Sequence, residues 1–92
     1  MLLKLNDGRE FRVWWGYWDK NPLLPRVIVV YLAPPDVPPA QVPVSGYAKC
    51  SPRDQFTRAK GRKIAFTRAI QGFSKSERAQ LWQELWSKGV TQ

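Results

Sequence analysis

The stretch from Arg9 to Trp18 most constrains how this chain can fold, because its side chains alternate in a strand-like pattern. Apolar side chains recur at every second position, which places them on one face of a strand: they are Phe11, Val13, Trp15 and Tyr17. The opposite face carries Glu10, Arg12, Trp14, Gly16 and Trp18. We predict that the first face lies in the core and that helices cover Trp14 and Trp18 on the second.

Turn and strand signals around this stretch predict a small antiparallel sheet. Asp7-Gly8 lies between Leu2–Leu5 and Arg9–Trp18, which is a strong hairpin signal. Arg26–Leu32 is rich in β-branched residues and is the best candidate for a central strand. Val44–Cys50 reads as a short fourth strand. Between these two, residues 33–43 hold five prolines, which favour an extended surface crossing over a strand.

The second half of the chain carries helix signals. Ser74-Lys75-Ser76-Glu77 is a capping box, and a stripe of Leu81, Trp82, Leu85 and Trp86 follows it before Gly89. Ser51-Pro52 also resembles a helix start, so we predict a helix over Pro52–Phe73. Glycine costs about 1 kcal/mol inside a helix, so a break at Gly61 is an equal alternative. The sequence therefore predicts one α+β domain over residues 1–92, mainly β to residue 50 and helical from residue 51, with about four strands followed by two helices.

The composition excludes several classes of function. The chain has 92 residues with one cysteine and no histidine, so it has no intramolecular disulfide and no ordinary zinc site. No close pair of carboxylates and no glycine-rich phosphate motif is present. We therefore expect no enzyme activity, no cofactor and no metal. With no signal peptide and no apolar run of transmembrane length, we expect a cytoplasmic protein without a membrane partner.

The charge of the chain is strongly asymmetric. The formal net charge is +8, and within Lys49–Arg68 seven basic residues stand against one acidic residue. Such clustering favours an anionic partner, since solubility alone does not require it, although a solvated surface is the simpler alternative. The candidate phosphate-binding residues are Arg53, Arg58, Lys60, Arg62, Lys63 and Arg68.

Arg62 needs an explanation, because on a helical wheel it falls within the apolar arc, one turn after Arg58. Asp54 could pair with Arg58, and a carboxylate of the sheet could pair with Arg62. Alternatively, a break at Gly61 could redirect both side chains, or the two guanidinium groups could share a bound anion. On the same wheel Gly61, Ala65 and Ala69 form a stripe of small residues, which we expect to pack against a neighbouring strand or helix.

Three aromatic residues are candidates for stacking on nucleic-acid bases: Trp14, Trp18 and Phe56. Each of them, like Tyr47, is by itself more typical of a core.

The C-terminal half resembles a known group of sequences. Cys50, Pro52, Asp54 and Phe56 form a Cys-x-Pro-x-Asp-x-Phe element, and residues 61–69 form a Gly-Arg-x-x-Ala-x-x-Arg-Ala segment ahead of a closing helix with tryptophan. This pattern is similar to that of short, mostly uncharacterised bacteriophage and prophage proteins. The resemblance implies a host-cell setting, in which such proteins bind nucleic acid, inhibit host proteins or sequester the signalling nucleotides of host defence.

The sequence thus predicts a non-catalytic protein that binds a phosphate-bearing ligand, either nucleic acid or a signalling nucleotide. The alternative is an inhibitor that docks its basic face on an acidic host protein. An uncovered face with Trp14 and Trp18 would also suit a homo-oligomer.

Overall fold

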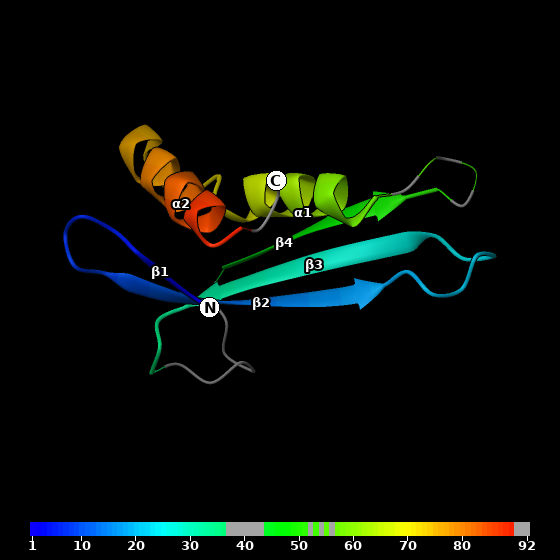
Figure 1. Cartoon of the computed structure of the whole chain (residues 1–92), viewed down its shortest axis with the longest axis horizontal. Coiled ribbons are helices and arrows are strands. Elements are labelled where there is room, and N and C mark those ends of the chain that lie inside the picture. The colour runs from blue at the N-terminus through cyan, green and yellow to red at the C-terminus, as the bar shows by residue number, and fades with distance from the viewer. Residues whose placement is uncertain (37–43, 52, 54, 56, 90–92) are drawn as a thin grey trace.

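A computed structural model describes residues 1–36, 44–51, 53, 55 and 57–89. Four strands form one antiparallel sheet in the order β1-β2-β3-β4, and two helices follow them, as the sequence predicts (Figure 1). The elements are β1 (Leu2–Lys4), β2 (Glu10–Trp18), β3 (Arg26–Ala33), β4 (Val44–Cys50), α1 (Arg58–Ala69) and α2 (Lys75–Ser87). Ala33 therefore ends β3 rather than beginning the proline-rich crossing, and residues 37–43 of that crossing lie outside the described part of the chain.

The first hairpin forms at Asp7-Gly8. Gly8 has a φ of +95°, a left-handed conformation that glycine adopts without steric cost, and its N–H donates to the carbonyl oxygen of Leu5 at 3.0 Å. The turn sets the register of the two strands, in which Leu3 lies opposite Phe11.

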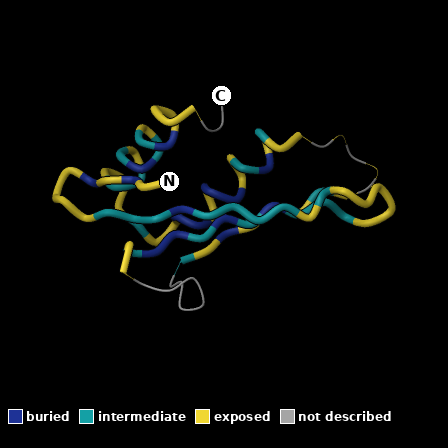
Figure 2. Tube along the Cα trace, turned by 60° about the horizontal axis from the view of Figure 1, so that its bottom comes forward, coloured by how far each residue is buried: buried dark blue, intermediate teal, exposed yellow. Residues whose placement is uncertain are grey.

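Both helices pack on one side of the sheet, and the core lies between them and the strands (Figure 1). Buried residues gather in the helices and in the middle of the strands (Figure 2). The alternation in β2 is as predicted: Val13 lies opposite Leu32 of β3, and Trp15 lies opposite Val30, all on the helix side.

The closest approach of helix and sheet is at Gly46 of β4. A Cβ atom on Gly46 would lie 2.3 Å from the carbonyl oxygen of Ala65 and 2.5 Å from the amide nitrogen of Ala69. Ala65 and Ala69 are buried. The small residues of α1 thus let its backbone touch a strand, as expected from the sequence.

The start of α1 differs from the prediction. The helix begins at Arg58 with Thr57 as its N-cap, whose hydroxyl accepts from the N–H of Lys60 at 3.3 Å. The hydroxyl of Ser51 instead accepts from the N–H of Arg53 in a local turn. Gly61 lies within the unbroken helix, and its N–H donates to the carbonyl oxygen of Thr57. The structure therefore excludes the break at Gly61.

The second helix follows the prediction closely. The capping box of Ser74 and Glu77 is formed, and Gly89 beyond the helix end has a φ of +77°. Leu81 and Leu85 of the apolar stripe are fully buried, whereas Trp86 is about half exposed. α2 is therefore anchored by the two leucines.

The sheet face that carries Trp14 and Trp18 is not covered by a helix, which contradicts the expectation that helices would bury it (Figure 1). The helices cover the opposite face because Gly46 admits α1 there. We call this side, which no helix of the described residues covers, the open face. It carries Arg12, Trp14, Gly16 and Trp18 from β2, Val27, Val29 and Tyr31 from β3, and Ser45, Tyr47 and Lys49 from β4.

Candidate nucleic-acid interface

Arg58 pairs with Asp19, which directly follows β2. Its Nε and Nη2 atoms donate to the two carboxylate oxygens of Asp19 at 2.6 and 3.0 Å. The Asp19 side chain is almost buried, with 8% exposed, and the hydrogen bonds from Arg58 lower its pKa below the usual value. Arg58 also lies over the ring of Tyr17 at 4.3 Å from the ring centroid. The partner of Arg58 is thus a carboxylate at the end of β2.

Arg62 packs against the same tyrosine from the next turn of α1. Its Nη1 atom donates to the hydroxyl of Tyr17 at 3.4 Å, at the outer limit of a hydrogen bond. The Nε atom of Arg62 is buried without a hydrogen-bond partner among the described residues. No carboxylate among those residues pairs with Arg62. Arg58 and Arg62 therefore converge on Tyr17 and fasten α1 to β2, instead of facing a common space for an anion.

Arg68 also has an internal partner. Its Nη1 atom donates to the backbone carbonyl oxygen of Tyr47 at 2.8 Å, which links the last turn of α1 to β4. Three of the six predicted phosphate ligands thus contribute to the joint between helix and sheet.

The remaining three predicted ligands are exposed. Arg53, Lys60 and Lys63 have no side-chain hydrogen bond or ion pair to any described residue. They are the part of the basic segment that can attract an anion without first breaking a contact within the protein.

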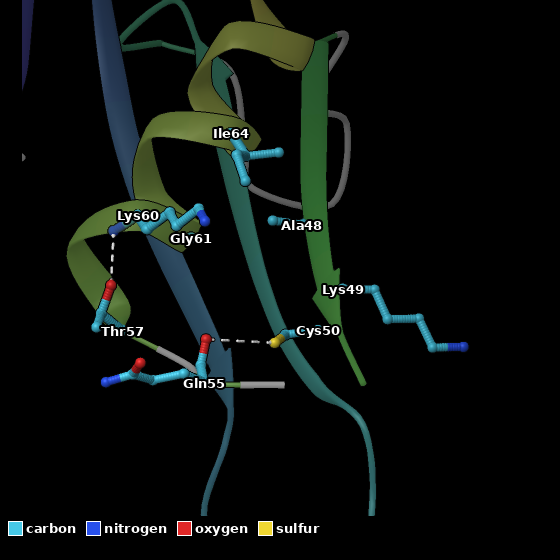
Figure 3. A pocket seen from close by; sticks show the side chains of 8 residues that line it. All are labelled: Ala48, Lys49, Cys50, Gln55, Thr57, Lys60, Gly61 and Ile64. Carbon is cyan, nitrogen blue, oxygen red and sulfur yellow. Dashed lines mark hydrogen bonds between the residues drawn. The ribbon is translucent and has the colours of Figure 1, made fainter. Parts of the chain in front are cut away.

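A cavity of about 420 Å³ lies between the end of β4 and the first turns of α1, lined among others by Cys50, Gln55 and Lys60 (Figure 3). The side chain of Lys60 extends over this cavity, whereas that of Lys49 points away from it. Cys50 is half-buried, and its Sγ atom lies 4.0 Å from the carbonyl oxygen of Gln55. Lys49 and Lys60 thus place positive charge on both sides of the β4 edge.

The open face brings together aromatic side chains from three strands. Trp14 of β2 lies directly opposite Tyr31 of β3. Tyr47 of β4 lies in the same cross-strand row as Val29 and Gly16, and Trp18 is two residues beyond Gly16 in β2. Trp18 and Tyr47 are 59% and 57% exposed. A Cβ on Gly16 would lie 2.8 Å from the Trp18 ring, so the indole lies across Gly16 along the surface of the sheet.

Cations flank these rings. Arg12 lies over the ring of Trp14 at 5.4 Å and donates to the carbonyl oxygen of Pro35, so its position is fixed. Lys49 occupies the position across the sheet from Trp18, in line through Val27. The open face is therefore both aromatic and basic.

The structure places two of the three predicted stacking residues, Trp14 and Trp18, on this face, while Phe56 lies outside the described residues. Sequence reasoning missed Arg12 and Tyr31 as members of the site and treated Tyr47 as core. The alternation of side chains along β3 and β4 divides each strand into two faces. Only the register between the strands shows that Tyr31 and Tyr47 lie on the same face as Trp14.

The described residues contain no group of His, Cys, Asp and Glu side chains that could hold a metal ion. Within the same part of the chain, no helix has the length and apolar character to cross a membrane.

Comparisons with known proteins found no match: no protein-family model, curated protein or solved structure is significantly similar to this chain. The function of this protein is therefore inferred from the site itself.

Proposed function

We propose that this protein is a non-catalytic binder of single-stranded nucleic acid, with the open face as its binding surface. The observation that carries the proposal is the row of aromatic rings between Arg12 and Lys49, on a sheet face that no described helix covers. Proteins that bind single strands combine ring stacking with cations that follow the phosphate backbone.

Exposure of the rings supports stacking. Trp18 and Tyr47 each present more than half of their surface to solvent, which leaves their ring faces accessible to bases. A duplex hides its base faces between neighbouring base pairs, so this surface suits unpaired bases. Trp14 and Tyr31 are half-buried beside them and extend the same surface.

The distribution of cations supports a path for the backbone. Arg12 of β2 and Lys49 of β4 lie on the open face, whereas Lys60 lies in α1 on the other side of β4. A nucleic-acid strand that crosses the open face from β2 to β4 would meet Lys49, and it would reach Lys60 by continuing around β4. The net charge of +8 would attract the polyanion over a longer range.

The test is binding of labelled single-stranded DNA, single-stranded RNA and duplex DNA of equal length, measured by fluorescence anisotropy over a series of salt concentrations. Stacking on an aromatic side chain contributes about 1–3 kcal/mol per base. Trp18→Ala and Tyr47→Ala should therefore each weaken single-strand binding roughly 5- to 150-fold.

Trp86→Ala is the matched control, because Trp86 is similarly exposed, at 48%, but belongs to α2 on the other side of the sheet. It should leave the affinity unchanged. Equal loss in Trp18→Ala and Trp86→Ala, or equal affinity of wild type for duplex and single strand, contradicts the proposal. A signalling nucleotide that raises the melting temperature without steep salt dependence would assign the ligand to the cavity beside Lys60 instead.

One observation favours a second candidate function, the inhibition of an acidic host protein. Leu23 and Leu24 in the β2–β3 loop are 84% and 57% exposed, and a cavity of about 290 Å³ lies beside Leu24 and Trp18. Exposed leucines suit a protein partner better than a nucleic acid. A pull-down from nuclease-treated host lysate separates the two functions: one stoichiometric protein retained in wild type and lost in Leu23→Ser/Leu24→Ser supports the inhibitor.

A further inference from the structure

The outer edge of β2 is covered along only part of its length. β1 pairs with β2 from Glu10 to Arg12, and the N–H of Val13 donates to the carbonyl oxygen of Met1 at 2.9 Å. β2 then continues past the end of β1 (Figure 1). No described residue pairs with this edge from Trp14 to Trp18.

Alternation of the backbone defines which groups face outward here. In an antiparallel pair, the N–H and C=O of every second residue point toward the same neighbour. Since Val13 bonds to Met1 on the outer side, Trp15 and Tyr17 also direct their N–H and C=O groups outward. These four backbone groups have no hydrogen-bond partner among the described residues.

The neighbouring edge shows that the fold protects such groups elsewhere. The N–H groups of Lys4 and Asn6 donate to side chains of α2, namely Glu84 at 2.9 Å and Gln80 at 2.7 Å. α2 thus covers the outer edge of the first hairpin. The segment Trp14–Trp18 has no equivalent cover, and it contains no proline and no charged residue that would discourage pairing with another strand.

We propose that a second copy of this chain pairs with this edge, β2 against β2 in antiparallel orientation, about a twofold axis at Gly16. This register is self-complementary: Trp15 faces Tyr17 of the second copy, and Tyr17 faces Trp15. Each of the four outward groups of one chain then bonds to a group of the other. The inference does not depend on the proposed function.

Side chains also match in this register. Trp14 of one copy lies opposite Trp18 of the other on the open face, in a pair without direct backbone hydrogen bonds, where side chains approach most closely. At the axis the two Gly16 residues meet without Cβ atoms, and the Trp18 indole of each copy lies across its own Gly16 on the open face. The pairing region fits between the end of β1 and the end of β2.

The result is a continuous eight-stranded sheet with both open faces on the same side. The two rows of aromatic residues then join at the axis. The positive charge of each copy, +8, opposes association, so added salt should strengthen the dimer, whereas it should weaken nucleic-acid binding. The failure of one proposal is therefore distinguishable from the failure of the other.

The first experiment uses the unmodified chain. Sedimentation equilibrium should show the mass rise from 10.6 kDa to twice that value with concentration, in a series extended to about 1 mM because small interfaces associate weakly. Over the same series, the amide protons of Trp15 and Tyr17 should become at least about tenfold slower to exchange. A constant mass, or a dimer in which these amides exchange as in the monomer, overturns the proposal.

The second experiment tests the register. Gly16→Cys in a Cys50→Ser background requires the Trp18 indole to turn away from the new Cβ atom, which would otherwise lie 2.8 Å from the ring. The variant should then form an intermolecular disulfide under mild oxidation, because paired residues without backbone hydrogen bonds have Cα atoms about 4.5 Å apart. The control is Thr67→Cys in the same background, at an exposed position of α1. Crosslinking no faster than the control overturns this register. Protection of Trp15 and Tyr17 only after nucleic acid or another protein is added assigns the edge to that partner and overturns the dimer.

Discussion

Replacing Gly46 with alanine tests how closely helix and sheet must approach. The added Cβ would lie 2.3 Å from the carbonyl oxygen of Ala65, 2.5 Å from the amide nitrogen of Ala69 and 2.9 Å from the Ala69 Cα atom. All three are backbone atoms, and residues four apart in a helix share a hydrogen bond. No side-chain rotation can relieve the contact, so α1 must move away from β4.

The magnitude follows from the cost of overpacking a core. Inserting a methyl group where neighbours cannot yield costs about 1–3 kcal/mol or more, and we place Gly46→Ala at the upper end because the obstacle is backbone. At about 4–8 °C per kcal/mol for a domain of this size, the melting temperature should fall by roughly 12–24 °C. The measurement is thermal and urea unfolding followed by circular dichroism.

Gly72→Ala is the matched control, because a Cβ there meets nothing within 4 Å and its φ is not positive. It should leave stability unchanged or raise it by up to about 1 kcal/mol, through reduced entropy of the unfolded chain. A loss of less than about 1 kcal/mol in Gly46→Ala would refute the reasoning and show that α1 adjusts freely on the sheet.

Two further predictions concern charged groups. Hydrogen bonds from the backbone and side chain of Ser74, together with Arg9, lower the pKa of Glu77 from 4.5 to about 2. A carboxylate whose pKa is lowered by folding stabilises the fold at pH values above its unfolded pKa. This contribution is lost as the pH falls toward 2. Urea unfolding at pH 5 and pH 2.5 should therefore show a smaller acid-induced loss in Glu77→Gln than in wild type, and equal losses would contradict the assignment. Arg62→Met replaces the guanidinium with an apolar group of similar length, which removes the long hydrogen bond to Tyr17 and the buried Nε group that has no partner among the described residues. The free energy of unfolding should therefore stay within about 1 kcal/mol of wild type or rise. A loss above about 3 kcal/mol in urea unfolding would show that the guanidinium has an essential partner.

The strands were predictable because their signals are local. Side-chain alternation and the Asp7-Gly8 turn predicted the first hairpin correctly. The strands β3 and β4 coincide with the stretches predicted for them, to within one residue at the end of β3. The cap of α2 was equally local, since Ser74 and Glu77 satisfy each other within one turn.

The start of α1 was predicted wrongly at Ser51-Pro52, because a side chain that can cap a helix does not by itself show that a helix begins there. Ser51 and Thr57 can each accept from a nearby N–H, and both do so in the structure. The helix begins after Thr57, and its Ala65 and Ala69 lie against Gly46. The local capping signal therefore did not decide where α1 begins.

The candidate site shows the same division. The sequence by itself determined that Trp14 and Trp18 share one face of β2 and that the basic residues cluster after β4, because alternation and charge are properties of neighbouring residues. Only the tertiary structure decided that this face stays open, since the helices follow the small contact surface at Gly46 to the opposite side. It also assigned Arg58 to Asp19 and Arg68 to the backbone of Tyr47, partners 39 and 21 residues away along the chain. A guanidinium forms hydrogen bonds with whichever oxygen atoms the fold brings close to it. The separation of two residues along the sequence does not show how far apart they lie in the folded chain.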